Sequence, residues 1–399
     1  MTDKSRSVLL IVFCQVSAMT LWFSASAASA SLLETGSISG QQAGLLTGAV
    51  QLGFVAGTLV SAWFGLPDRL DPRKLFAACA AAGAILNLTL LTTGFDNPGT
   101  IVLRFLTGAM LAGVYPVGMK LAAGWAGRAV GLMIGTLVGA LTLGSALPYL
   151  FGAVSELEWR STIVISSLAA LLSAAAILFA QLGPDHTTSA RFVPGEAWLE
   201  LRRRPVLLAN AGYLGHMWEL YAMWAWIGVF LAWGLRQAGQ APIVDPALLT
   251  FLVIASGALG SVGAGFLADR YGRTTITIAA MIASGACAAT IGLLPPAGAV
   301  VLIAVAIIWG ITIVADSAQF SAAIAELSPP RLVGSMLTIQ TSIGFLLTFL
   351  TIQAMPFLID LLSWRFTFAV LAVGPFLGAL AMWRLRREPD AVLIAGGRM

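Results

Sequence analysis

The stretch GFLADRYGR, residues 265–273, places Asp269, Arg270 and Arg273 together between two long apolar runs. The run before it lies near 247–267 and the run after it near 275–294. Each run holds about 20 mainly apolar residues, enough for a helix to cross a hydrocarbon core about 30 Å thick. The stretch is therefore predicted to be a short polar loop at which the chain turns back into a membrane.

The whole chain has the composition of a membrane protein. Of its 399 residues 58% are hydrophobic and 10% are charged, whereas a soluble domain carries about 25% charged residues. Only helices are expected, because backbone groups that face lipid must be hydrogen-bonded within their own segment and alternating strand patterns are absent. We predict an all-α protein with twelve transmembrane helices, near 8–30, 42–66, 75–95, 100–123, 130–152, 161–182, 206–234, 247–267, 275–294, 299–322, 334–358 and 364–384.

The basic residues predict how the chain is oriented. With the N-terminus in the cytoplasm, only Arg160, Arg236 and Arg365 of the 22 Lys and Arg residues fall in outer segments, and Arg104 lies within a helix. The others fall on the inner side, as membrane proteins prefer. We expect both termini in the cytoplasm and the protein in the cell (inner) membrane.

An internal repeat predicts two similar halves. Asp68-Arg69 recurs as Asp269-Arg270, and LEWRSTIVI (157–165) recurs as LSWRFTFAV (362–370). We expect an N-terminal six-helix bundle over 1–183, a cytoplasmic linker over 184–205 and a C-terminal six-helix bundle over 206–399. Transporters built from repeats bind their substrate near the membrane midplane, between the repeats.

The opening stretch resembles the loop motif G-x-x-x-D-R-x-G-R of the major facilitator superfamily. The motif residues are Gly265, Asp269, Arg270, Gly272 and Arg273, and the helix count and the 6+6 repeat extend the resemblance over the whole chain. In that family the loop locks the cytoplasmic side and is released on inward opening. The first-half copy keeps Asp68 and Arg69 but has Asp71-Pro72 where the family has Gly-Arg.

These aspartates are predicted to be gating residues rather than substrate ligands. An aspartate at the inner end of such a helix can face the amino end of a neighbouring helix, where unpaired N–H groups favour negative charge. Anchoring of a basic loop at the membrane surface is the alternative role.

Four charged or titratable residues lie at membrane depth, where a charge costs roughly 2.5–3.5 kcal/mol on the insertion scale. His216 and Glu219 share one face of the run 206–234, Asp316 lies in 299–322, and Arg104 lies in 100–123. Arg104-Phe-Leu-Thr-Gly108 resembles the family's R-x-x-x-G segment, which is tied to proton coupling or to substrate anions. We predict proton-coupling roles for all four, and a hydrogen-bonded pair that only fixes helix packing is the alternative for His216 and Glu219.

Polar and aromatic residues at helical spacing are candidates for substrate binding. Trp309, Thr312, Asp316 and Gln319 recur on one helical face, and by resemblance helices 1, 4, 7 and 10 line a central cavity. The predicted substrate-binding residues are Gln15, Trp22, Tyr115, Tyr213, Trp309, Thr312, Gln319 and Gln340. Packing within the helices is the alternative for each.

The sequence favours a transporter over an enzyme. It has no HExxH, serine-elbow or phosphate-loop motif, only two histidines, and three cysteines without metal-ligand spacing. No cofactor, metal or nucleic acid is expected. The expected partners are protons, lipid and a small-molecule substrate, and we expect a monomer.

The substrate class is left between two main hypotheses. The acidic residues favour proton antiport that exports small lipophilic or cationic molecules. Proton-coupled symport of a small anion, nitrate/nitrite-like or monocarboxylate-like, is the alternative, although the runs 42–66, 247–267 and 334–358 lack the basic residues that such porters use. Neutral solutes such as sugars stay open.

Overall fold

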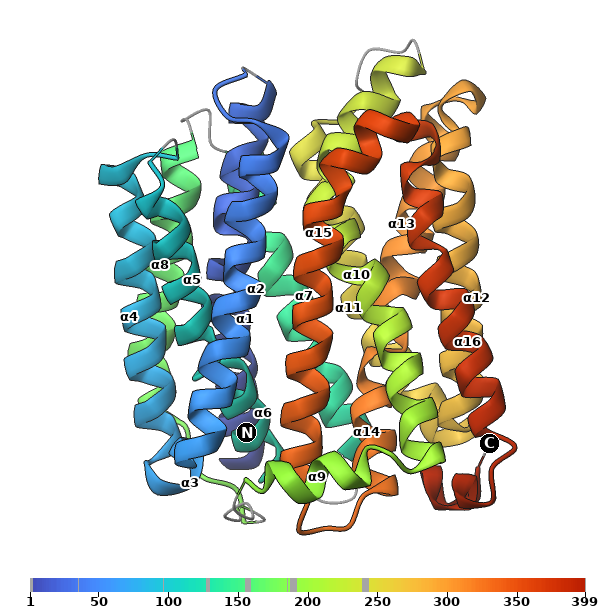
Figure 1. Ribbon diagram of the computed structural model, residues 1–399. Coiled ribbons are helices and arrows are strands. Elements are labelled where there is room, and N and C mark those ends of the chain that lie inside the picture. Colours follow the sequence, from blue (N-terminus) through green and yellow to red (C-terminus); the bar gives the residue numbers. More distant parts are fainter. Residues whose placement is uncertain are drawn as a thin grey trace.

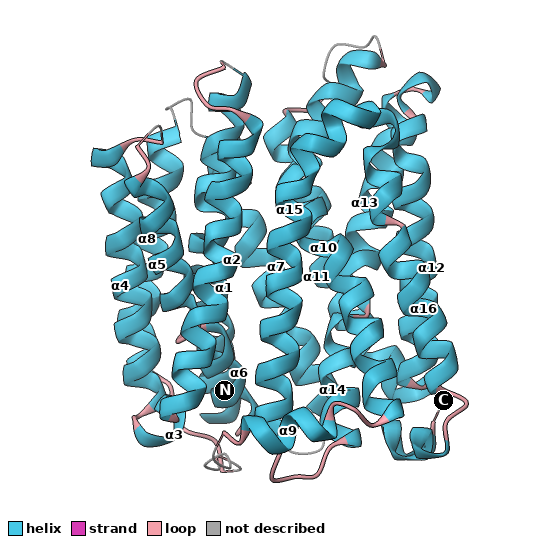
Figure 2. Ribbon diagram, in the orientation of Figure 1, coloured by secondary structure: helices cyan, strands magenta, loops and turns pink. Residues whose placement is uncertain are grey.

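The computed structural model describes residues 3–34, 36–95, 97–126, 130–154, 159–184, 186, 192–238 and 244–398. Within these ranges every regular element is a helix (Figure 2). Leu157 and Glu158 of the repeat, and residues 185 and 187–191 of the expected linker, lie outside the described residues. The first half contains α1 (Asp3–Glu34), α2 (Gly40–Phe64), α3 (Leu66–Arg69), α4 (Pro72–Thr93), α5 (Gly99–Leu111), α6 (Tyr115–Ala123), α7 (Val130–Val154) and α8 (Trp159–Ala176).

The second half begins with a short helix in the expected linker and continues with long helices. Its elements are α9 (Pro194–Glu200), α10 (Arg204–Gln237), α11 (Pro246–Tyr271), α12 (Arg273–Thr290), α13 (Ala299–Ala315), α14 (Ser317–Leu327), α15 (Val333–Leu371) and α16 (Val373–Leu385). A 3₁₀ segment, η4, follows at Pro389–Gly397.

Ten segments of the described chain are long and apolar enough to cross a membrane. One of them, Val333–Leu385, covers the last two expected spans, and it bends at Ser363, where φ is 55° and ψ is 168°. The expected span 206–234 corresponds to α10, which has 34 residues but is not among the ten. Its polar residues account for the lower apolarity, and they are the residues that the sequence marks as functional.

Both chain ends lie at the same end of the molecule, the bottom of Figure 1. We call this the terminal end and the opposite one the far end. The helices run between the two ends, with α4, α5 and α8 on one side and α12, α13 and α16 on the other, while α9 lies at the terminal end (Figure 1). The two halves meet most extensively where α7 packs on α11 and where α2 packs on α15.

Equivalent close contacts recur in the two halves. A Cβ atom on Gly108 of α5 would lie 2.0 Å from the Val50 carbonyl oxygen of α2, and one on Gly310 of α13 would lie 1.9 Å from that of Val253 in α11. In both halves the helix that carries the glycine is also followed by a break in helical structure, between α5 and α6 and between α13 and α14. Small residues that let backbones approach this closely are typical of membrane helix pairs, and their recurrence agrees with the internal repeat.

We predict that Gly260→Ala destabilises the protein by about 1–3 kcal/mol, the usual cost of overpacking a filled interface. Its new Cβ would lie 1.9 Å from the carbonyl oxygen of Ile311. Gly263→Ala on the same helix is the matched control, because no atom lies within 4 Å of the added methyl group. Thermal unfolding in detergent should show a lower Tm for Gly260→Ala only; equal Tm values for both variants would contradict the close packing.

Candidate functional site

Glu219 lies inside the second half, held by three helices. It projects from the middle of α10, and its residue is only 1% exposed. Its Oε1 accepts a hydrogen bond from Trp309 Nε1 of α13 at 2.7 Å, and its Oε2 accepts one from Ser284 Oγ of α12 at 3.0 Å. Hydrogen-bond donors are what make a buried carboxylate tolerable. The carboxyl group therefore links α10, α12 and α13 and does not project into the boundary between the halves.

His216 and Asp316 form a second buried contact close to Glu219. His216 Nδ1 lies 2.8 Å from Asp316 Oδ1, and His216 Nε2 has no hydrogen-bond partner. Asp316 sits at the break between α13 and α14, where the chain leaves helical pairing. Residues three apart share a helical face, so His216 and Glu219 point to the same side of α10. The structure thus brings together three of the four expected proton-coupling residues.

Arg104 lies in the first half, apart from those three residues. Its Nη2 donates to the carbonyl oxygen of Trp22 at 2.7 Å, and its Nη1 donates to that of Leu21 at 3.2 Å and to Asn87 Oδ1 at 3.1 Å. The guanidinium fork therefore fixes the backbone of α1 beside α4 and α5. In the described chain its hydrogen-bond partners are uncharged oxygens, and no acidic side chain is among them.

Between the two halves lies a layer of packed aromatic side chains. The Trp22 ring centroid is 5.9 Å from that of Tyr221 and 5.4 Å from that of Phe345, both in the second half. Aromatic pairs at such separations stabilise a contact beyond the area they bury. We call this set the aromatic layer; it consists of Trp22, Phe23 and Phe54 from the first half and Tyr221, Trp224 and Phe345 from the second.

Buried polar groups without partners lie at the aromatic layer. The indole nitrogens of Trp22 and Trp224 and both amide atoms of Gln51 have no hydrogen bond. Gln51 lies between Gly48 and Phe54 on the surface of α2, about 60° from each. Gly48 packs on Phe349 of α15, and Phe54 packs on Trp22 of α1. The Gln51 side chain therefore points between α1 and α15. The sequence prediction missed Gln51, although a carboxamide midway along an apolar span was available as a signal.

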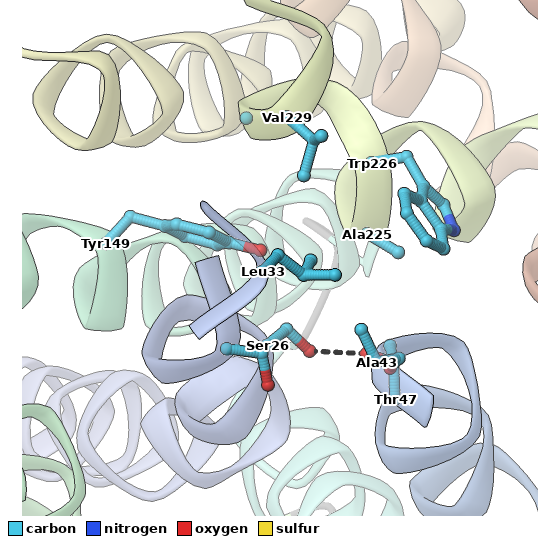
Figure 3. Close-up of a pocket in the computed structure, with 10 residues that line it drawn as sticks. Ser26, Leu33, Ala43, Thr47, Tyr149, Ala225, Trp226 and Val229 are labelled. Carbon is cyan, nitrogen blue, oxygen red and sulfur yellow. Dashed lines mark hydrogen bonds between the residues drawn. The ribbon is translucent and has the colours of Figure 1, made fainter. Parts of the chain in front are cut away.

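A cavity of about 920 Å³ lies at the far end between the two halves. It is bounded by the ends of α1, α2, α10 and α11 and includes Tyr149, Trp226 and Trp364 in its wall. A small recess of about 20 Å³ shares Tyr149 and Trp226 with it, and Ser26 and Thr47 hydrogen-bond across that recess at 2.7 Å (Figure 3). Tyr149 Oη donates to the Trp224 carbonyl oxygen at 3.3 Å, so this tyrosine connects the cavity wall to the aromatic layer.

At the terminal end, contacts between the halves are direct. Ser261 Oγ of α11 donates to the Gly135 carbonyl oxygen of α7 at 2.9 Å. Near α9, the linker binds the second half: the Val193 N–H donates to Ser335 Oγ at 3.0 Å, and Glu196 pairs with Arg331. The described contacts therefore close the terminal end, while the cavity lies at the far end.

The second-half copy of the loop motif forms a charged network at the terminal end. Arg273 donates to Glu326 at 3.0 Å and to Gln319 Oε1 at 3.0 Å, and lies 3.7 Å from Asp269. Gly272 ends α11 with φ at 94°, a conformation that favours glycine. Gly265 is buried within α11, and Arg270 stacks on Tyr271 at 5.2 Å. Arg273 is thus the centre of the motif, and it ties α12 to α14.

The first-half copy is paired differently. Asp68 pairs with Lys120 of α6, whereas Arg69 lies at the end of α3. Asp71 caps α4 and accepts from Arg73, whose side-chain hydrogen bond lowers the pKa of Asp71 to about 2. Asp68 and Asp269 were expected to face the amino end of a neighbouring helix. In the described chain each pairs with a basic side chain, Asp68 with Lys120 and Asp269 with Arg273.

Three of the remaining predicted substrate-binding residues, Gln15, Trp309 and Gln319, are engaged within their own half. A Cβ atom on Gly118 of α6 would lie 2.0 Å from Gln15 Oε1, so Gln15 fills space inside the first half. Gln340 lies one turn before Gly344, against which Tyr213 packs. Trp309 is hydrogen-bonded to Glu219, and Gln319 is hydrogen-bonded to Arg273. The Thr312 hydroxyl donates to the Ile308 carbonyl oxygen at 2.8 Å.

Three of the predicted residues stay near the boundary. Trp22 belongs to the aromatic layer, and Tyr115 of the first half lies near Tyr213 and Tyr221 of the second. Helix periodicity had placed the stripes on common faces, but it could not tell which face meets the other half. Among the described residues no group of three or more His, Cys, Asp or Glu side chains is arranged to hold a metal ion.

Comparisons with known proteins agree with this architecture. The family model described as "Major Facilitator Superfamily" matches residues 11–350 and 220–399. A mutant of the nucleoside transporter NupG superposes with a TM-score of 0.71 at 14% identity, over 96% of this chain and 100% of that one. The proton:xylose symporter XylE bound to 6-bromo-6-deoxy-D-glucose gives 0.65 at 14% identity, over 96% of each chain. No curated protein sequence matches significantly.

We predict that Arg104→Lys lowers stability by about 1–3 kcal/mol, because one ammonium group cannot reproduce a planar fork that holds three oxygens. Thermal unfolding of the purified protein in detergent measures the loss. Arg365→Lys, at an exposed arginine, controls for the chemical change and should leave Tm unaltered. If Arg104→Lys also leaves Tm unaltered, the anchoring role of Arg104 is wrong.

Proposed function

The chain belongs to the Major Facilitator Superfamily and is therefore a multi-pass membrane transporter and not an enzyme, and we propose that it moves a small, uncharged, polar organic solute together with protons. Alternating access between the two halves carries the solute across the cell (inner) membrane. The family match agrees with the resemblance inferred from residues 265–273.

The uncharged character of the aromatic layer between the halves is the observation that carries this proposal. The groups there are indole, phenol and carboxamide side chains, several of them buried without partners. A buried polar group without a partner costs about 1–3 kcal/mol, and a solute with donors and acceptors would remove that cost. Trp22 and Gln51 are the residues we assign to solute binding, with Tyr115, Tyr213 and Tyr221 close by.

Neither charged substrate finds a counter-ion in the aromatic layer; the charged residues Arg236, Asp245 and Asp360 line the far-end cavity instead. Export of lipophilic cations was expected because Glu219 and Asp316 were thought to face the cavity, but both are engaged within the second half. The guanidinium of Arg104, the partner expected for an anion, is engaged by carbonyl oxygens and Asn87. A neutral solute has no such requirement, and NupG and XylE are named for nucleosides and xylose, both uncharged and polar.

Proton coupling is assigned to Glu219, His216 and Asp316. An antiporter of the kind expected from the sequence needs substrate and proton to compete for one carboxylate. Here the described hydrogen bonds and ion pairs of the carboxylates do not involve Trp22 or Gln51, so proton and solute can be bound at the same time. This separation supports symport over antiport, and XylE is itself a proton symporter.

The membrane arrangement that goes with this proposal has twelve crossings. They are the ten apolar segments, with the last one divided at Ser363 and with α10 added. The terminal end is assigned to the cytoplasm because the basic residues lie there. The two bundles span 1–183 and 206–399, joined by the linker 184–205, and one chain is the working unit, with Asp68, Arg69 and the motif at 265–273 as its gate.

A substrate panel tests the proposal. Reconstituted protein in proteoliposomes would be given uridine, D-xylose, tetraphenylphosphonium and nitrate, each with and without an imposed pH gradient. We expect uptake of a neutral solute with accompanying proton influx. Transport of tetraphenylphosphonium or nitrate alone would overturn the assignment.

We predict that Gln51→Met raises Tm and abolishes binding of the transported solute. The substitution removes a buried, unpaired carboxamide and so removes a cost of about 1–3 kcal/mol in the empty protein. Thermal unfolding and equilibrium binding measure the two effects. Gln15→Met is the control: its amide is also buried and unpaired but faces the first half, so Tm should rise and binding should persist. Full binding by Gln51→Met would remove Gln51 from the site.

A further inference from the structure

We propose that Ser284 is a positioning residue that keeps Glu219 hydrogen-bonded in both of its protonation states and thereby sets the pH at which Glu219 exchanges a proton. The inference rests on the proposed proton coupling through Glu219. Ser284 lies on α12 and was not among the residues that the sequence marked.

The Ser284 hydroxyl group has two acceptors within reach. Its Oγ lies 3.0 Å from Glu219 Oε2 and 3.3 Å from the Met281 carbonyl oxygen one turn earlier in α12. A hydroxyl carries a single hydrogen and can also accept. When Glu219 is charged, Ser284 donates to its carboxylate, which is the stronger acceptor.

Protonation of Glu219 reverses this hydrogen bond without leaving a group unpaired. The incoming proton forms an O–H bond at Oε2, and that O–H donates to Ser284 Oγ. The serine hydrogen turns to the Met281 carbonyl oxygen, so one proton is taken up and none is released. Trp309 Nε1 donates to Oε1 at 2.7 Å, and this bond holds the carboxyl group in place in both states.

Among the groups around Glu219, Ser284 is the one whose hydrogen bond can reverse when Glu219 gains or loses a proton. Asp316 and the Cys287 thiol lie near Glu219, and His216 lies one turn away, paired with Asp316. The charged residues of α11 and α16 lie near the ends of those helices, and those of α15, Asp360 and Arg365, flank its bend at Ser363. Phe368 packs on the Trp309 ring with centroids 5.0 Å apart, so apolar side chains cover the cluster on the side of α15.

Infrared difference spectroscopy of the full-length protein in lipid, titrated from acidic to alkaline pH, tests the inference. The carbonyl stretch of a protonated carboxyl group reports Glu219, and its loss in Glu219→Gln identifies the band. In Ser284→Ala we expect the titration midpoint to rise by about one pH unit, a tenfold change in proton affinity, because the charged form loses the stronger hydrogen bond. Ser284→Thr should restore the midpoint.

Ser173→Ala is the matched control. Ser173 is fully buried in α8 and donates to the Ala170 carbonyl oxygen at 2.8 Å, with no carboxylate assigned to it. The titration midpoint of the Glu219 band in Ser173→Ala should equal that of the wild type. A Glu219 band that titrates identically in Ser284→Ala would overturn the role of Ser284 while leaving proton coupling intact. If no band is lost in Glu219→Gln, the proton-coupling assignment itself fails.

Discussion

The cost of placing a charge in an apolar medium is the constraint on which the rest of this structure depends. At the centre of a membrane that cost is a few kcal/mol per group even on the lenient insertion scale, so each buried charge must be satisfied by nearby dipoles or charges. Arg104 is satisfied by carbonyl oxygens and Asn87 within the first half, and Glu219 by an indole and a hydroxyl within the second. Each charge therefore travels with its own half.

This arrangement leaves an uncharged aromatic layer between the halves, and that layer lies in the part that must open and close. Aromatic contacts such as Trp22 with Tyr221 can separate without exposing an unpaired charge. Close helix contacts at glycines keep each half rigid while this happens. Examples are Gly108 of α5 against α2 and Gly310 of α13 against α11. Such a movement would close the far-end cavity and open the terminal end, which is closed here, in turn.

Much of the fold follows from the sequence, because helix length and apolarity are set by the membrane and the repeat reveals the two halves. The loop at Gly272 was also predictable, since its positive φ favours the glycine of the motif. The direction in which each polar stripe faces was not predictable. Periodicity puts Trp309 and Asp316 on one side of a helix, but whether that side meets the other half or the interior of its own depends on packing angles that no single segment encodes. Gln51 and Ser284 were missed because one isolated polar residue in an apolar run carries little signal until its neighbours are known.

The central claim is that solute and proton occupy separate places, the solute at the uncharged aromatic layer and the proton at Glu219. Equilibrium binding of the transported solute to Glu219→Gln tests it most directly, because the substitution keeps the shape of the side chain and removes its titration. The account predicts solute affinity equal to that of the wild type, with no dependence on the protonation of this residue. A loss of affinity of tenfold or more, about 1.4 kcal/mol, would contradict it and would make Glu219 a ligand of the solute.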